Sequence, residues 1–230
     1  TDFRGMQFIR RSHNDGHYYF LVNQGEDMID EWINLEVDFE TAFIMDPMSG
    51  SVGVASLRKD KSNPQLRVQL QPGSTCVVKT NASVLDEYKS WYYLNTNGKS
   101  HVVKSSWKVD FRFGGPILPP SFETEELQSW TNQGGPAESF AGTAIYRTEF
   151  NVPSKDTTWL LDLGKLASSA RVYLNGEYIE TIIGPFYICI LRDVLATDNK
   201  LEIEVTNLSA NRIRDLDIRG FHWKKFEDVN

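Results

Sequence analysis

The sequence is poor in the residues that build metal and redox sites. It contains two cysteines, Cys76 and Cys189, and four histidines in 230 residues. Neither cysteine has a Cys or His neighbour at the spacing of a zinc site, and each lies within an apolar strand pattern. We therefore expect two buried free thiols, with a disulfide between them as the alternative. No cofactor and no metal site are expected.

Long apolar segments are also missing. No run approaches the roughly 20 apolar residues that a membrane-spanning helix needs. The first residues, Thr1 to Arg4, lack the apolar stretch of a signal peptide, and the chain begins without Met. We expect a processed or excised piece of a longer protein, whose missing signal says little about its compartment.

Positive charge is in deficit. The 24 Lys and Arg face 31 Asp and Glu, which gives a net charge of −7 and an isoelectric point of about 5.2. Phosphate backbones and anionic membranes bind through clustered basic residues. The composition therefore predicts neither nucleic acid nor a membrane as a partner.

Catalytic motifs are absent as well. The sequence has no phosphate-binding glycine loop, no dinucleotide fingerprint and no Gly-x-Ser-x-Gly elbow. Glu123, Glu125 and Glu126 form the best candidate for the carboxylate pair of a glycosidase, but a solvated loop or helix start explains them as well. Asp215 and Asp217 could bind calcium, although their spacing is not that of an EF-hand. We assign no catalytic residue and expect no activity from this chain alone.

The first half of the chain alternates short strands with turns. The turn Asp15-Gly16 joins two apolar runs, residues 8–11 and 17–23, and this arrangement is typical of a β-hairpin. Residues 32–37 and 65–70 alternate apolar and polar side chains, as half-buried strands do. Such closely spaced strands predict a β-sandwich.

The second half follows the same pattern. Asn175-Gly176 predicts a two-residue hairpin turn, and residues 201–205 alternate perfectly. Residues 123–127 could begin a short helix, but helical periodicity is otherwise nearly absent. Arg147 lies among apolar strand residues, where we expect it to pair with an acid such as Glu149 or Asp162. The prediction is an all-β chain of two tandem sandwiches.

Part of the second half resembles a known family. Residues 139–147, 161–176 and 199–207 look like the entry, middle and end of the sugar-binding domain of family 2 glycoside hydrolases. The addition of residues 211–215 is more similar to the α-L-rhamnosidase-like enzymes of family 106. In those enzymes a catalytic (β/α)₈ barrel precedes the β-domains.

The first half fits the same resemblance. Residues 10–23 look like the strand pair that follows the barrel, and residues 45–50 resemble a Trp-Asp-Pro-x-x-Gly turn in which Met45 replaces the Trp. The resemblance implies an immunoglobulin-like sandwich over residues 1–104 and a galactose-binding-like jelly roll over residues 105–230. It also implies an upstream catalytic barrel as partner, catalytic carboxylates outside this sequence, and a periplasmic or extracellular location.

Sugar binding is the one activity that we expect this chain could carry. Trp130 lies between chain-breaking residues, and therefore in a predicted loop, with Asn132 and Glu138 as polar neighbours. A ring that stacks on a sugar and a few polar groups that match its hydroxyls make a sugar site. The alternative is that the ring covers the end of the sandwich.

The function predicted from the sequence is therefore structural support for a polysaccharide-degrading glycoside hydrolase, with possible weak carbohydrate binding. An independent carbohydrate-binding module is the main alternative, and a complete small hydrolase is the third.

Overall fold

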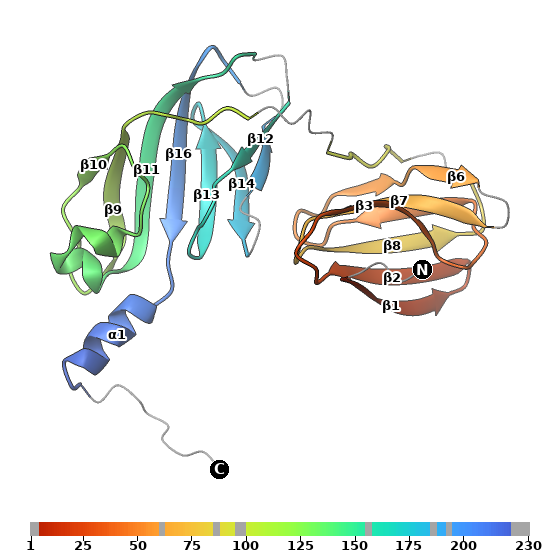
Figure 1. The fold of residues 1–230 in the computed structure, drawn as a ribbon, viewed down its shortest axis with the longest axis horizontal. Coiled ribbons are helices and arrows are strands. Elements are labelled where there is room, and N and C mark those ends of the chain that lie inside the picture. Colours follow the sequence, from red (N-terminus) through yellow and green to blue (C-terminus); the bar gives the residue numbers. More distant parts are fainter. Residues whose placement is uncertain are drawn as a thin grey trace. The chain divides into compact units, whose positions relative to one another are not determined.

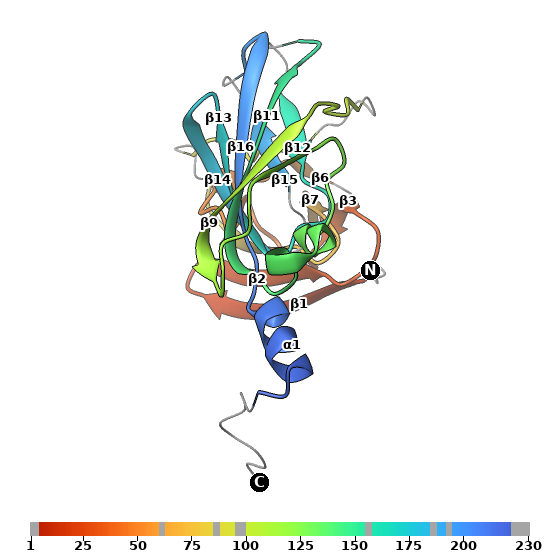
Figure 2. The same ribbon diagram turned by 90° about the vertical axis from the view of Figure 1, so that its left-hand side faces the viewer.

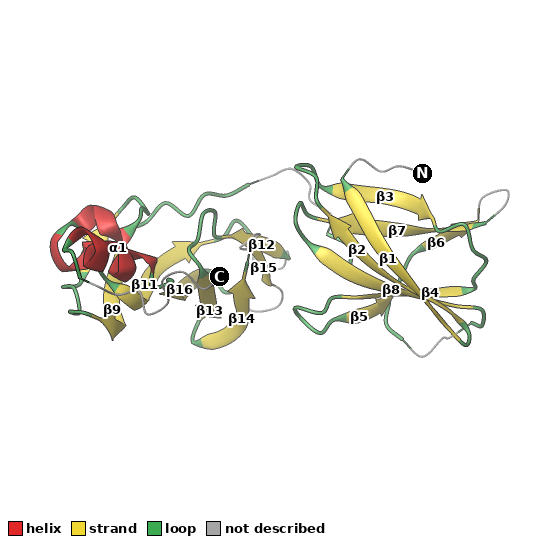
Figure 3. Cartoon of the chain, turned by 90° about the horizontal axis from the view of Figure 1, so that it is seen from below, coloured by secondary structure: helices red, strands yellow, loops and turns green. Residues whose placement is uncertain are grey.

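The computed structural model describes residues 5–59, 63–84, 88–94, 100–154, 158–184, 188–191 and 195–221. Within them antiparallel strands dominate, as Figure 3 shows. Helix is restricted to three short segments. This confirms the predicted all-β fold. The chain divides into two compact units, residues 1–99 and 100–230, which are described in turn.

Two antiparallel sheets build the first unit (Figure 1). The larger has the order β1-β2-β8-β4-β5, with bounds Met6–His13, Gly16–Asn23, Thr75–Asn81, Thr41–Met45 and Val52–Val54. The smaller has the order β3-β7-β6, with bounds Ile29–Asn34, Pro64–Leu70 and Leu57–Lys59. The predicted hairpin is confirmed, but its two turn residues are Asn14 and Asp15, because Gly16 already pairs with His13 as the first residue of β2.

The core of this unit follows from the alternation of its strands. Leu66, Val68 and Leu70 of β7 are buried, as are Leu21 of β2 and Val78 of β8, and all belong to one apolar cluster. Burying an aliphatic side chain contributes about 1.5–3 kcal/mol. A register slip by one residue would turn these side chains toward water, so the core fixes the strand register.

The second unit has a sheet of six strands and a pair of strands (Figure 2). The large sheet has the order β10-β9-β11-β16-β13-β14, with bounds Phe122–Thr124, Trp107–Gly115, Ala141–Asn151, Asp198–Thr206, Ser169–Leu174 and Glu177–Ile183. The pair consists of β12 and β15, Trp159–Asp162 and Ile188–Leu191.

Three short helices complete the second unit. The 3₁₀-helices η1 and η2, Trp130–Gln133 and Gly135–Glu138, connect β10 to β11, and α1, Ala210–Ile218, follows β16. Figures 1 and 2 place η1, η2 and α1 at the same end of the large sheet. Hydrogen bonds link them there: the side chains of Asn211 and Arg214 donate to the backbone oxygens of Phe140 and Glu138, at 3.4 Å each.

The predicted turn at Asn175-Gly176 is confirmed. Both residues have positive φ, 53° and 86°, as a two-residue hairpin turn of this kind requires. Asn175 also receives a hydrogen bond on its side-chain oxygen from the backbone nitrogen of Lys200, at 2.9 Å. The turn is therefore fixed to the neighbouring strand β16.

The predicted helix start at residues 123–127 is wrong. Glu123 and Thr124 belong to β10, where they pair with Lys108 and Trp107 of β9. Partners far along the chain thus decide the structure of this segment against its local helical preference. The helix that does form, α1, was not predicted.

Both cysteines are buried and unpaired, as expected. Burial raises the pKa of Cys76 and of Cys189 to about 12, because a thiolate loses its hydration in the core. Neither thiol is therefore a nucleophile at neutral pH.

Candidate functional site

The predicted sugar loop is ordered by its own aromatic ring. Trp130 begins η1 and is only 5% exposed. Its ring meets those of Phe111 and Phe140 edge-on, with centroid distances of 5.5 and 5.7 Å. Both neighbours belong to the core of the second unit. No face of the indole is left for a sugar to stack on, so the ring anchors the loop to the core.

The two polar residues of that prediction remain at the surface. Asn132 and Glu138 are exposed. The Asn132 amide donates to the side-chain oxygen of Gln128 at 2.9 Å, which keeps it within its own loop. The structure thus separates the predicted ring from its predicted polar neighbours, and the three side chains do not share one exposed surface.

A polar network on the outer face of the six-stranded sheet was missed by the sequence reasoning. The Arg147 guanidinium donates to the carboxylates of Asp110 and Glu202, at 2.8 and 2.5 Å. The predicted partners Glu149 and Asp162 are therefore wrong. Arg147 lies opposite Glu202 in the strand register, so its partner comes from the next strand and not from its own.

The charge state of Asp110 follows from its neighbours. A hydrogen bond from Ser121 lowers the pKa of this carboxyl most, and the positive charges of Lys108, Arg147 and Arg112 lower it further. A carboxyl that acts as a general acid needs a raised pKa. Asp110 is thus held as a carboxylate, the form that accepts the hydrogen bond from Arg147 and not the form of a general acid.

Two tyrosine rings, one of them exposed, lie on the same outer face. Tyr173 of β13 and Tyr178 of β14 pair across the strands, with centroids 5.7 Å apart and planes at 66°. Tyr178 is 57% exposed, and its hydroxyl shares a hydrogen bond of 2.9 Å with Thr181. Arg171 lies opposite Thr181 in the register. This cluster offers a ring, a hydroxyl and a guanidinium, which are groups that contact sugars. The alternation of Tyr173 with buried Val172 and Leu174 was the signal that could have revealed it.

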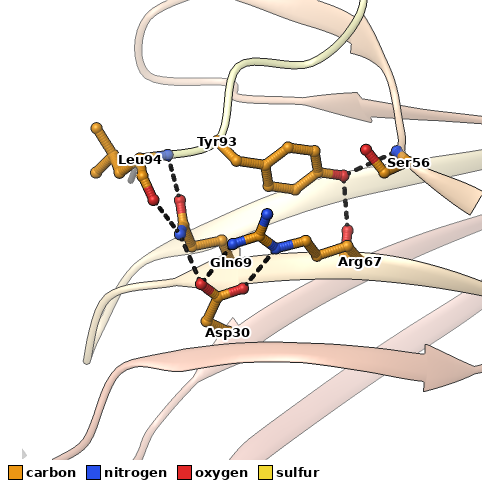
Figure 4. A network of polar contacts seen from close by, with 6 residues as sticks. All are labelled: Asp30, Ser56, Arg67, Gln69, Tyr93 and Leu94. Carbon is orange, nitrogen blue, oxygen red and sulfur yellow. Dashed lines mark hydrogen bonds and ion pairs between the residues drawn. The ribbon is translucent and has the colours of Figure 1, made fainter. Parts of the chain in front are cut away.

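The first unit carries a second network, on its three-stranded sheet (Figure 4). The Arg67 guanidinium donates to both carboxylate oxygens of Asp30, at 2.7 Å each. It also lies 4.7 Å from the centre of the Tyr93 ring. The Tyr93 hydroxyl donates to the backbone oxygen of Arg67 at 2.9 Å and accepts from the backbone nitrogen of Ser56 at 3.0 Å.

Gln69 completes this network. Its side-chain amide donates to the backbone oxygen of Leu94 at 2.8 Å and accepts from the backbone nitrogen of Leu94 at 2.7 Å. The hydrogen bond from Arg67 lowers the pKa of Asp30 most, and Gln69 assists. The network therefore holds the segment around Tyr93 and Leu94 against the sheet, and its groups are occupied by one another.

The remaining acidic candidates show no site. Glu123, Glu125 and Glu126 are exposed, and the Asp215 carboxylate accepts from Arg212 and Arg219 at 3.2 and 3.3 Å. Over the described ranges, no group of three or more His, Cys, Asp or Glu is placed to hold a metal ion.

Comparison with known proteins gives the context of the fold. No family model matches the chain. A putative β-glucuronidase of Formosa agariphila is 33% identical over 177 residues, which is 69% of this chain and 14% of that protein. A solved rhamnosidase from Novosphingobium sp. PP1Y superposes with a TM-score of 0.75 at 24% identity and covers 94% of this chain and 21% of that one. A β-glucuronidase structure from Bifidobacterium dentium gives a TM-score of 0.38 over 45% of this chain.

The resemblance to a β-sandwich region associated with glycoside hydrolases is confirmed. The chain spans 14% of its sequence relative and 21% of the rhamnosidase whose fold it shares. In the part of the chain that the structure describes, no helix has the length and apolar character to cross a membrane.

Proposed function

We propose that this chain is a non-catalytic accessory region of a longer glycoside hydrolase that degrades polysaccharides, and that it supports a catalytic (β/α)₈ barrel. One observation carries the proposal: the superposition extends over 94% of this chain but only 21% of the rhamnosidase. An almost complete match to about a fifth of a longer enzyme supports the role of one region within a larger protein.

The chemistry of the acidic residues supports this proposal. Glycoside hydrolysis usually needs two carboxyl groups about 5–10 Å apart, one of them with a raised pKa. The pKa of Asp30 and that of Asp110 are both lowered, by partners that keep these groups ionised. Asp110 and Glu202 do lie near one another, but the Arg147 guanidinium lies between them and occupies both.

We assign the first unit to the immunoglobulin-like class and the second to the galactose-binding-like jelly rolls. Antiparallel sheets of five and three strands, and of six and two strands, support these assignments. A periplasmic or extracellular location fits a protein that meets polysaccharide.

The direct test has two parts. The gene that encodes this chain is expected to contain a barrel-length stretch in addition to these residues, and the 230-residue chain alone is expected to turn over neither aryl rhamnosides nor aryl glucuronides. Turnover that disappears in Glu125→Gln or Glu126→Gln would show that the chain is itself an enzyme.

A carbohydrate-binding module is the second candidate, and the exposed ring of Tyr178, paired with the half-buried Tyr173, favours it. A shallow site on a sheet buries little of a sugar, so we expect dissociation constants in the roughly millimolar to micromolar range. On a glycan array, Tyr178→Ala should abolish binding, whereas Phe113→Ala, which removes a ring that is 76% exposed, should not. Loss of binding in Asn132→Ala or Glu138→Ala instead would place the site in the originally predicted loop.

A further inference from the structure

One cross-strand row of apolar side chains runs over all five strands of the large sheet in the first unit. Ile9 pairs with Phe20, Phe20 with Val77, Val77 with Met45, and Met45 with Val52. These five residues, which we call the apolar row, alternate with core residues such as Leu21 and Val78. They therefore lie on the face of the sheet that points away from the core.

Three of the five residues of the apolar row are exposed to solvent, and Met45 and Val77 are half-buried. Ile9 is 62% exposed, Val52 50% and Phe20 40%. Single exposed apolar residues are ordinary, but a continuous apolar surface marks a place where another surface packs. A sheet face meant for water would carry polar side chains at these alternate positions.

The next row on the same face, which contains Phe43, is partly covered by another segment of this chain. Phe43 belongs to that row and is only 4% exposed, because the ring of Tyr88 packs on it with a centroid distance of 4.8 Å. The backbone of Lys89 and Trp91 is bonded to Val54 beside it. This segment shields Phe43 but leaves Ile9, Phe20 and Val52 of the apolar row exposed.

Basic groups lie along one side of the apolar row. Arg11 pairs with Tyr18, and Tyr18 pairs with Lys79, in the row next to it. The Lys79 ammonium lies 5.8 Å from the centre of the Tyr18 ring. This basic margin stands out in a chain of net charge −7. A complementary surface would have an apolar centre and an acidic margin.

We propose that the apolar row docks a folded domain of the same longer polypeptide, a surface with an apolar centre and an acidic margin. This inference rests on the proposed function. The relatives hold 79–86% of their length outside the matched region, since this chain spans 21% and 14% of them. A domain on the same polypeptide is present at a high effective concentration near the apolar row, so a small contact area is enough for it to bind. A stable pair of separate copies buries about 800 Å² on each partner, from roughly 20–30 residues, which five side chains do not supply.

The test compares two isoleucines of equal exposure. Ile9 on β1 and Ile183 on β14 are both 62% exposed, and each lies on the edge strand of its sheet. In the 230-residue chain, Ile9→Lys and Ile183→Lys should each shift the melting temperature by no more than about 2 °C, because exposed substitutions cost little. In the full-length protein, Ile9→Lys should speed limited proteolysis at least tenfold, while Ile183→Lys leaves the rate unchanged.

Further variants and outcomes make the test decisive. If Ile9→Lys impairs folding of the short chain, Val52→Lys takes its place, and Arg11→Glu should show the same effect with a strong dependence on salt. Equal behaviour of the Ile9 and Ile183 variants in a full-length glycoside hydrolase would overturn the docking while leaving the proposed function intact. A gene without any further domain would overturn both. A concentration-dependent dimer of the short chain that Ile9→Lys abolishes would make a second copy the occupant and overturn the proposal.

Discussion

Trp130→Ala is expected to destabilise the second unit instead of merely removing a ligand contact. The indole is 5% exposed and packs edge-on against Phe111 and Phe140. Replacing a buried aromatic side chain with alanine costs about 3–5 kcal/mol, from lost transfer free energy and from the cavity. The two ring contacts alone contribute about 0.5–1.5 kcal/mol each. The free energy of unfolding of a domain is about 5–15 kcal/mol in total, so the substitution should remove a large fraction of it.

Urea unfolding of the 230-residue chain, followed by tryptophan fluorescence and circular dichroism, measures this loss. The midpoint of the second unit should fall by about 2 M, given the usual dependence of about 1–3 kcal/mol per molar urea. Tyr178→Ala is the matched control, because it removes an exposed ring from the same unit and should cost about 0.5 kcal/mol or less. An unchanged midpoint for Trp130→Ala together with lost sugar binding would refute the argument from burial and return the ring to a binding surface.

Three further outcomes are expected. Tyr93→Phe should lower the stability of the first unit by about 1 kcal/mol in urea unfolding, because the hydroxyl no longer accepts from the backbone nitrogen of Ser56; an unchanged midpoint would contradict this. Gly114→Ala should cost at least about 1–3 kcal/mol, since its φ is +140° and a Cβ would lie 2.3 Å from a carbonyl oxygen of β11; normal stability would contradict the crowding. Burial raises the pKa of Cys76 and of Cys189 from 9.0 to about 12, so the stability that their neutral thiols contribute is complete below pH 9 and is lost as the pH rises toward 12. The urea midpoint should therefore fall between pH 9 and 12, and it should fall less steeply in a variant with both cysteines replaced by alanine.

Local chemistry made much of the fold predictable from the sequence. Asn175-Gly176 dictates a tight hairpin by itself, because both residues adopt the positive φ that the turn requires. The first hairpin was also predicted, although its turn residues are Asn14 and Asp15, one position earlier than expected. The strands at residues 65–70 and 201–205 follow from an alternation that needs no knowledge of partners. These features depend only on neighbouring residues, and they were predicted correctly.

The features that depend on distant residues were not. Arg147 contacts Asp110 and Glu202, which lie 37 and 55 positions away in the sequence. The strand order that brings them together cannot be predicted from the residues near Arg147. Trp130 lies in a segment rich in breakers and polar residues, which suggested an exposed loop, yet two 3₁₀-helices direct its ring into the core. Helix α1 buries no side chain, so its sequence does not need the apolar periodicity by which a helix is usually predicted. The local feature that indicated a helix was the spacing of three and four residues between Asp215 and its ion-pair partners Arg212 and Arg219.

Each unit contains one buried thiol, and its reaction with an added reagent can report the opening of that unit. Cys76 lies in the core of the first unit and Cys189 in that of the second. An alkylating reagent can reach either sulfur only when the surrounding unit opens, and peptide mass spectrometry distinguishes the two modified sites. The opening rate of each sandwich can thus be read from one unmodified molecule. In the longer protein that we propose, the same measurement on each thiol would show which unit is protected by further domains.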